Sequence, residues 1–392
     1  MVANICSVVL NSVSSDTRVL KQAHALARAG RQVTIVGVAE PGQDQSREVL
    51  ANGVTIRRCA YPLSAPHGGA ARRLTALGRK ARGMLAMFQA IRRARPRILH
   101  CHDVYTLPLG AAARGLLSCR VVYDAHEIYE EAADAGPAQA RRFGRIHRAC
   151  AWACDGFVTI NPSIAAWYAE NHPRLPPAVV VMNAAPALPA IRYDGRLHRA
   201  AGLPPEVKIL LFQGGLKAMR GLEEVAAAAG HLPPPWAVVM MGHGELREPL
   251  ARTARDLAKK IGRPHPPLTL IPPAPLAELP LWTAGAAVGL IPYLKRGLNH
   301  WYCTPNKLWE YPSAGVPVLA SPFPEMMKLI QAHGFGWALA PDWKAESLAA
   351  QVAGLRPQDL DRAREGCGRL MAQENWAKQE QHLLGLYQRL LA

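Results

Sequence analysis

Residues 4–38 read NICSVVL-NSVSSD-TRVLKQAHALARAG-RQVTIVGV, the pattern of a strand, a loop, a helix and a second strand. Asn4–Leu10 and Gln32–Val38 are short apolar runs of strand length. Between them, apolar side chains recur at helical spacing over Asp16–Ala29, and Gly30 ends that helix. A strand, a helix and a further strand in this order predict the start of a parallel, doubly wound sheet.

The same alternation continues to the end of the chain. The sequence predicts further strands at Val54–Arg58, Ile98–His102, Val121–Tyr123, Gly156–Ile160 and Val179–Met182, and then, after the Pro- and Ala-rich residues 184–206, at Lys208–Gln213, Trp236–Met241, Leu268–Ile271, Ala287–Ile291 and Pro317–Ser321. Helices are expected over Leu222–Gly230, Asn306–Ala314 and Asn375–Leu391. We therefore expect two Rossmann-like α/β domains, residues 1–190 and 191–372, followed by a helix over 373–392.

Composition favours a folded, cytoplasmic chain with a preference for anions. Of the 392 residues, 46 are Lys or Arg and 29 are Asp or Glu, so the formal net charge is +17. The eight cysteines are scattered without a CxxC pair, which is typical of reduced thiols. The first residues lack the basic start and cleavage site of a signal peptide, and no stretch of about 20 residues is apolar enough to span a bilayer.

One stretch concentrates the positive charge. Nine basic residues crowd residues 72–97, and apolar side chains interleave with them: Arg72, Arg73, Arg79, Lys80, Arg82, Arg92, Arg93, Arg95 and Arg97. The pattern fits an amphipathic helix on an anionic membrane and equally a helix that covers a sheet and turns its basic face to solvent. Nucleic acid is not an expected partner, because no helix-turn-helix, RNP-like or zinc-finger pattern is present.

Polar groups follow three predicted strands of the first half. The loop Asn11–Asp16 precedes the first helix, where Ser15 or Asp16 is expected to act as the N-cap. His100–Asp103 and Asp124–Glu127 each stand at the carboxyl end of a strand, where open α/β sheets bind ligands. His102, His126 or Glu127 would there orient or deprotonate a hydroxyl, with a metal site as the less favoured alternative.

Two motifs stand out in the second half. Gln213–Gly221 places two glycines, Lys217 and Arg220 after a strand, a composition suited to close approach of phosphate groups. In Pro305–Val318, Lys307 begins a helix and Glu310 lies one turn later. A lysine at a helix N-terminus suits a diphosphate, and a carboxylate one turn on can accept two ribose hydroxyls.

This ordered set of motifs resembles the family 4 glycosyltransferases, over nearly the whole chain. Asp16–Arg18, His100–Asp103, Tyr123–Glu127 and Pro305–Ala320 resemble the opening, the N-domain motifs and the donor-site motif of that family. The resemblance implies the GT-B fold, in which two Rossmann-like domains face each other across a cleft and a C-terminal helix crosses back to the first. It also implies an N-terminal acceptor domain and a C-terminal donor domain.

The resemblance further implies roles for particular residues. Catalytic roles fall on His102, Arg220, Lys307 and Glu310. Donor binding falls on Gly214, Gly215, Lys217, Arg220, Gly242, Pro305, Asn306, Lys307 and Glu310. The acceptor side, or N-domain cleft, would be formed by Ser14, Ser15, Arg18, Asp103, His126 and Glu127.

The implied activity is transfer of a sugar, with retention, from a nucleotide-diphosphate donor. The acceptor would be a saccharide, a lipid-linked saccharide or a small molecule, and neither metal nor cofactor is expected beyond the nucleotide-sugar co-substrate. Two positions depart from the family pattern: Tyr302 replaces a second glutamate, and Gly215 replaces an arginine. Two alternatives therefore stay open, a sugar-nucleotide epimerase on the same scaffold and a degenerate nucleotide-sugar-binding protein.

Overall fold

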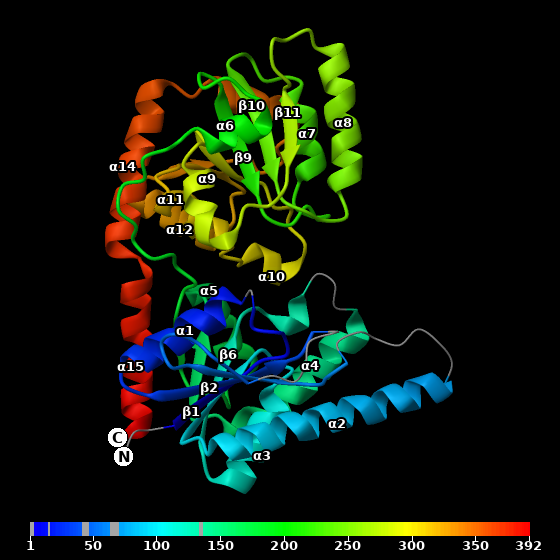
Figure 1. Ribbon diagram of the computed structural model, residues 1–392, viewed down its shortest axis with the longest axis vertical. Helices are drawn as coiled ribbons and strands as arrows, with labels where there is room; N and C mark the ends of the chain where they lie inside the picture. Colours follow the sequence, from blue (N-terminus) through cyan, green and yellow to red (C-terminus); the bar gives the residue numbers. More distant parts are fainter. Residues whose placement is uncertain (1–3, 15, 41–46, 63–69, 133–135) are drawn as a thin grey trace. The chain divides into compact units, whose positions relative to one another are not determined.

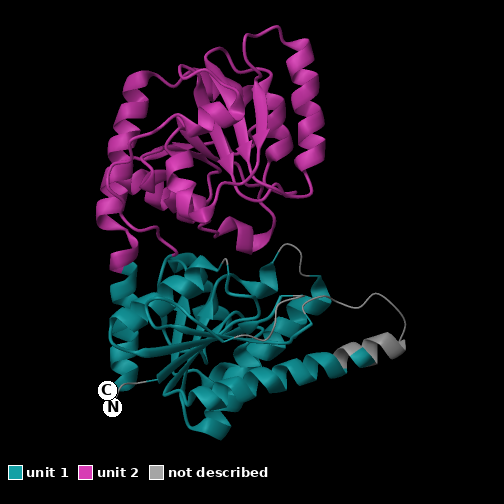
Figure 2. Ribbon diagram, in the orientation of Figure 1, with its two compact units in different colours: residues 1–182, 379–392 teal, residues 183–378 magenta. Residues whose placement is uncertain are grey.

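The computed structural model describes residues 4–14, 16–40, 47–62, 70–132 and 136–392. The chain divides into two compact units, shown in two colours in Figure 2. The first unit contains residues 1–182 and 379–392, and the second contains residues 183–378. Each unit has its own sheet and its own hydrophobic core.

The first unit is built on an eight-stranded sheet in which all pairs are parallel except β3 with β4. In spatial order the strands are β3 (Arg47–Val49), β4 (Thr55–Cys59), β2 (Gln32–Val38), β1 (Asn4–Val8), β5 (Ile98–His102), β6 (Arg120–Ala125), β7 (Gly156–Thr159) and β8 (Ala178–Val180). The order reverses direction at β1, so β1 and β5 flank a switch point of the kind that binds ligands in such sheets.

Helices link these strands and cover the sheet (Figure 1). They are α1 (Thr17–Arg28), α2 (Ala70–Ala94), α3 (Leu107–Leu117), α4 (Pro137–Cys150) and α5 (Pro162–Asn171), with short 3₁₀ turns at Tyr129–Glu131 and Ala151–Ala153. Asp16 is the N-cap of α1 and its carboxylate accepts the amide N–H of Val19 at 3.1 Å, which confirms the capping expected at that loop.

The basic helix α2 is a sheet-covering helix over its second half. Met87, Ala90 and Ile91 are buried in one core with strand residues of β1 and β2. The side chains of Arg72 and Arg73 lie outside the described residues. Within the described part of the chain, none of the helices combines the length and apolar character that a membrane crossing requires.

The second unit is built on a six-stranded, fully parallel sheet. In spatial order the strands are β11 (Leu268–Ile271), β10 (Trp236–Met241), β9 (Lys208–Gln213), β12 (Val288–Ile291), β13 (Val318–Ala320) and β14 (Gly336–Ala338). The helices are α6 (Arg196–Ala201), α7 (Leu222–Ala229), α8 (Arg247–Lys260), α9 (Leu279–Thr283), α10 (Gly297–Trp301), α11 (Lys307–Ser313), α12 (Pro324–His333), α13 (Ala345–Ala353) and α14 (Pro357–Gln373), with a 3₁₀ turn at Leu276–Glu278. The predicted strands of this half are all present, and β14 is an addition that the sequence pattern did not reveal.

The last helix, α15 (Trp376–Leu391), begins in the second unit and has most of its length in the first. It runs beside α1 in Figure 1, where Arg28 and Glu380 form an ion pair of 2.6 Å. Leu383, Leu386 and Tyr387 are buried, because they form the apolar face of the helix. The two parallel sheets and this returning helix confirm the predicted fold class.

Candidate functional site

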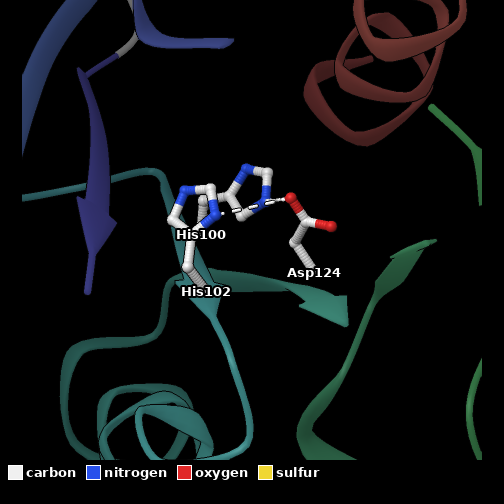
Figure 3. A group of neighbouring side chains, drawn as sticks. All are labelled: His100, His102 and Asp124. Carbon is white, nitrogen blue, oxygen red and sulfur yellow. Dashed lines mark ion pairs between the residues drawn. The ribbon is translucent and has the colours of Figure 1, made fainter. Parts of the chain in front are cut away.

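In the first unit, the site begins at the carboxyl ends of β5 and β6. His102 and Asp124 are direct partners in the register of these parallel strands. His100 and His102, two residues apart on one strand, share a face of the sheet, and their rings stack with centroids 4.3 Å apart (Figure 3). The carboxylate of Asp124 lies beside both rings, 3.4 Å from Nδ1 of His102.

Asp124 is a fully buried carboxylate with a dedicated cation. Arg18 of α1 donates to both carboxylate oxygens, from Nε at 3.0 Å and from Nη2 at 2.7 Å, and donates from Nη1 to the carbonyl oxygen of Val181 at 2.6 Å. Gln22, one turn along α1, donates a third bond to this carboxylate at 2.8 Å. Burial alone would raise the pKa of Asp124, but the adjacent Arg18 guanidinium and the His126 ring hold that pKa well below its usual range.

His126 bridges two carboxylates. Its Nδ1 lies 3.1 Å from Asp103 and its Nε2 lies 3.3 Å from Asp124. Although burial lowers the pKa of His126, the two carboxylates outweigh burial and raise the pKa to about 10. His126 is therefore an imidazolium at neutral pH with both N–H groups engaged. It can orient its neighbours, but it has no lone pair with which to deprotonate a hydroxyl.

The two stacked histidines differ from His126. His100 accepts or donates a bond of 2.6 Å at Nδ1 to the Tyr387 hydroxyl of α15, and burial together with His102 lowers the pKa of His100 to about 4. Nε2 of His102 is buried without a hydrogen-bond partner. Because the His102 side chain has no exposed surface, its predicted contact with the reacting sugar stays a prediction, whereas His126 and Asp103 are partly exposed.

Among the described residues of this unit, two groups of side chains are close enough to share one cation. The first group is His100, His102 and Asp124. A cation bound there would lie against the guanidinium of Arg18, which already binds both carboxylate oxygens of Asp124. The other group is Glu130, His147 and His172, in which Glu130 lies 3.1 Å from His147 and 3.0 Å from His172. These contacts already satisfy the three groups as ordinary hydrogen bonds.

The loop after β1 is held in an unusual backbone conformation. Val13 has φ of 69°, which is rare for a β-branched residue, and its N–H donates to the Asn11 side chain at 2.8 Å. Asn11 in turn donates to the N-cap Asp16 at 2.8 Å, and a Cβ at Gly37 would lie 2.8 Å from the Asn11 carbonyl oxygen. Ser14 is exposed at the tip of this loop. Ser15 lies outside the described residues.

In the second unit, Glu310 is fixed by a short chain of hydrogen bonds. Gln213, the last residue of β9, donates from its side-chain amide nitrogen to Oε2 of Glu310 at 2.9 Å, and its side-chain oxygen Oε1 accepts from the Thr283 hydroxyl at 2.8 Å. Tyr311 holds the backbone beneath, because its hydroxyl receives the N–H of Gln213 and donates to the carbonyl of Leu211. One carboxylate oxygen of Glu310 is thus oriented by protein, and the other can accept from a ligand.

Two cations lie beside Gly214 with no carboxylate of their own in the described chain. Lys307 is buried and donates to the Tyr293 hydroxyl at 3.1 Å, and the Arg220 guanidinium lies 5.3 Å from the centre of the Tyr293 ring. A Cβ at Gly214 would lie 3.1 Å from the Lys307 ammonium and 4.0 Å from Arg220. A positive site with glycine on one side is suited to phosphate oxygens, since only a bare backbone leaves room for them.

Glycines join the two loops at this edge of the sheet. The N–H of Gly214 donates to the Met241 carbonyl at 2.9 Å, and the N–H of Leu216 donates to the His243 carbonyl at 2.8 Å. A Cβ on Gly242 would lie only 1.9 Å from the carbonyl oxygen of Gly214. Gly242 is buried and packs against the Gly214 backbone, and its place in the donor site stays a prediction.

The structure brings some of the predicted site residues together in two groups, one within each unit. Gly214, Gly215, Arg220, Lys307 and Glu310 form one group, with Lys217 and Asn306 exposed nearby in sequence and Pro305 half-buried. Asp103, His126 and Asp124 form the other group, with Glu127 half-buried after β6. Arg18, predicted as a ligand-facing residue, is instead buried in its pair with Asp124, because both of its donor edges are used inside the protein.

Several residues support the site in ways that were not predicted from the sequence. They are Gln22, Tyr129, Gln213, Thr283, Tyr293 and Tyr387. Tyr129 donates a short bond to Asp103, a residue with φ of 65°. Gln213 was recognisable as a polar residue ending an apolar strand, but no pattern in the sequence indicated that Tyr387, far along the chain, would reach His100.

Comparison with known proteins shows what this chain is similar to. A family model described as "Glycosyl transferase 4-like domain" matches residues 15–186. No curated protein sequence matches the chain. Three solved structures cover nearly all of it: sucrose-phosphate synthase from Thermosynechococcus elongatus (16% identity, 99% of each chain, TM-score 0.77), HepE of Anabaena in complex with UDP-glucose (12% identity, 98% of this chain and 99% of that one, TM-score 0.73), and the trehalose-6-phosphate protein from E. coli bound with UDP-2-fluoro glucose (12% identity, 98% of each chain, TM-score 0.73).

Proposed function

We propose, from the premise that this chain is a glycosyltransferase of GT-B fold with a glycosyl transferase 4-like domain, that it transfers a sugar from a nucleotide-diphosphate donor to a saccharide or lipid-linked acceptor in glycan assembly. The observation that carries the donor class is the pair Arg220 and Lys307, two cations without a carboxylate partner in the described chain, beside Gly214 and next to an oriented Glu310. Two of the similar structures hold UDP-glucose or a fluorinated analogue of it, which supports the same donor class here.

In the proposed mode of binding, the diphosphate lies against Gly214 and Gly215. Arg220 presents a forked guanidinium to its oxygens, and Lys307 adds a second positive charge. Glu310 accepts the ribose hydroxyls. The stabilisation from these cations increases as the nucleotide leaves and negative charge develops on its phosphate, so they stabilise the transition state more than the bound donor.

We further propose that transfer proceeds with retention and without a metal. The acceptor hydroxyl attacks from the face that the nucleotide leaves, its C–O bond forms as the donor C–O bond breaks, and the departing phosphate takes the hydroxyl proton. Arg220 and Lys307 supply the counter-charge that a divalent cation supplies in other enzymes. His126 cannot be the base, since its charged ring already donates to Asp103 and Asp124.

The test is NMR of donor consumption with UDP-, GDP-, ADP- and dTDP-linked sugars, with and without a panel of saccharide acceptors. We expect a glycoside whose anomeric configuration, read from the signal of its anomeric proton, is that of the donor. The same amount of product should form with and without EDTA. Arg220→Glu should abolish turnover, while Arg252→Glu, an exposed position on α8, should not. Epimerised sugar or nucleotide released without acceptor would instead support the epimerase alternative, and binding without any turnover would support the degenerate one.

A further inference from the structure

A second basic cavity lies in the first unit, away from the residues described so far. Its volume is about 530 Å³, and five arginines line it: Arg47, Arg57, Arg92, Arg93 and Arg95. We call this set the arginine pocket. Arg47 comes from β3, Arg57 from β4, and the other three from the end of α2 and the residue that follows it. Three of the arginines that crowd the basic stretch of the sequence therefore converge with two from the sheet.

The arginine pocket lies at the opposite end of the sheet from Asp124 and His126. Its uncharged lining includes Asn4, Gln32 and Thr55, the first residues of three neighbouring parallel strands. The candidate site residues follow the last residues of such strands. Since β1 has five residues, the two edges are about 13 Å apart at roughly 3.3 Å per residue. A ligand in the pocket would thus bind independently of the sugar-transfer site.

Among the described residues, no carboxylate balances the charges of the arginine pocket. Each of the described residues that line the cavity is either an arginine or uncharged, and within the described ranges none of the five arginines forms an ion pair. The neighbouring Arg58, by contrast, is paired with Glu48 at 2.8 Å. A concave surface of one sign concentrates its field and attracts ions of the opposite sign.

The pairing of β3 with β4 makes the unbalanced charge costly. Arg47 and Arg57 are direct partners in this antiparallel ladder, and like charges in such a position are destabilising. Arg92 and Arg93 have a local explanation, because cations in the last turn of a helix offset its dipole. That explanation does not extend to Arg47 and Arg57 in the strand pair, where an anion between the two guanidinium groups would offset their repulsion.

We propose that the arginine pocket binds a ligand with two or more phosphate groups. Guanidinium groups bind phosphate oxygens with paired N–H donors. Five of them around one cavity carry more positive charge than a single monoanion would neutralise. The volume is that of a small-molecule site, which typically measures about 300–1,000 Å³. The same phosphate chemistry is offered by a free oligophosphate and by a lipid head group that carries two phosphates, and the experiment below separates them.

The test measures binding of inorganic tripolyphosphate by calorimetry at low salt. The proposed donor site also attracts phosphate, so binding is measured in a Lys307→Met background, where that site is weakened. We expect one tripolyphosphate per chain and at least a tenfold loss of affinity on adding Arg47→Gln and Arg57→Gln. Arg145→Gln, an exposed arginine of α4 outside the pocket, should leave the affinity unchanged. Equal affinity with and without the two pocket substitutions overturns the proposal, as does an equal loss in the control.

Stability without ligand gives a second readout. Because removing one of two facing charges relieves repulsion, Arg57→Gln should raise the melting temperature in phosphate-free buffer or leave it unchanged. In the Lys307→Met background, it should also reduce the rise in melting temperature that tripolyphosphate causes. A lower melting temperature with an undiminished tripolyphosphate response would mean that Arg57 is purely structural, and the proposal would fail.

Vesicles identify the source of the phosphate. Sedimentation with vesicles that contain cardiolipin, whose head group carries two phosphates, is compared with sedimentation with phosphatidylcholine vesicles for the wild type and the Arg47→Gln/Arg57→Gln variant. Binding to the anionic vesicles that tripolyphosphate displaces and the variant loses indicates a lipid head group. Tripolyphosphate binding without vesicle binding indicates a free ligand. If neither binds to the wild type, the arginine pocket is not a phosphate site.

Discussion

Replacing His126 with asparagine should remove a positive charge that the first unit holds between two carboxylates. Asparagine keeps a side chain of similar length and one N–H donor, but it carries no charge. The wild-type ring lies 3.1 Å from Asp103 and 3.3 Å from Asp124. The variant therefore isolates the contribution of the imidazolium from that of the side-chain volume.

The expected loss of unfolding free energy follows from the pKa of His126, which rises from 6.5 to about 10 in the folded protein. At about 1.4 kcal/mol per tenfold change in proton affinity, the ceiling is roughly 5 kcal/mol of unfolding free energy. The side chains of His126 and Asp103 are 22% and 27% exposed, so solvent screening lowers the expected value to about 2–3 kcal/mol. Because the folded pKa is raised, this stability is fully present below about pH 6.5 and is lost as the pH rises through about 10.

The assay is urea unfolding of the wild type, His126→Asn and the exposed control His231→Asn at several values between pH 6 and pH 10. The two compact units can unfold separately, so the transition that the substitution shifts is the one to compare. The difference in unfolding free energy between wild type and His126→Asn should be largest at pH 6 and should shrink toward pH 10. A difference that stays constant across this range would refute the charged bridge between Asp103 and Asp124.

Three further substitutions have expected outcomes. Gly242→Ala should abolish nucleotide-sugar binding in calorimetry, because its Cβ would lie 1.9 Å from the Gly214 carbonyl oxygen; normal affinity would contradict the close packing of the two loops. Arg18→Met should lower the unfolding free energy by about 3–5 kcal/mol, since it leaves the buried carboxylate of Asp124 without its cation. An unchanged melting temperature would show that this ion pair adds nothing. Lys307→Met should reduce turnover by about 10²–10³-fold, the usual cost of one group that stabilises developing charge, and near-normal turnover would remove Lys307 from the proposed mechanism.

The fold could be predicted from the sequence because parallel strands are buried on both faces. Apolar runs such as Lys208–Gln213 and Trp236–Met241 stand out between helical patterns, and the structure has strands at both ranges. The short edge strands β3 and β14 were not predicted. β3 is fully exposed and β14 is only partly buried, so neither carries the buried apolar pattern from which strands are recognised.

The candidate site could be predicted where its residues lie close together in the sequence, within one motif. Glu310 falls one turn after Lys307, as the motif indicated. The role of Arg18 was not readable, because its partner Asp124 is 106 residues away and nothing local reveals that the pair is buried. The bond between Tyr387 and His100 depends on the return of α15 to the first unit, which brings together residues 287 positions apart.

The central claim, that the second unit binds a nucleotide-diphosphate sugar through Glu310, is tested most directly by thermal shift. Wild type, Glu310→Gln and the exposed control Glu365→Ala are screened against UDP-, GDP-, ADP- and dTDP-linked sugars. At about 100 times the dissociation constant, a donor should stabilise the wild type by about 2.7 kcal/mol. We expect one nucleotide class to raise the melting temperature of the wild type and the control and to lose most of its effect in Glu310→Gln. An equal rise in all three proteins, or no rise with any of these donors, would contradict the proposed donor site.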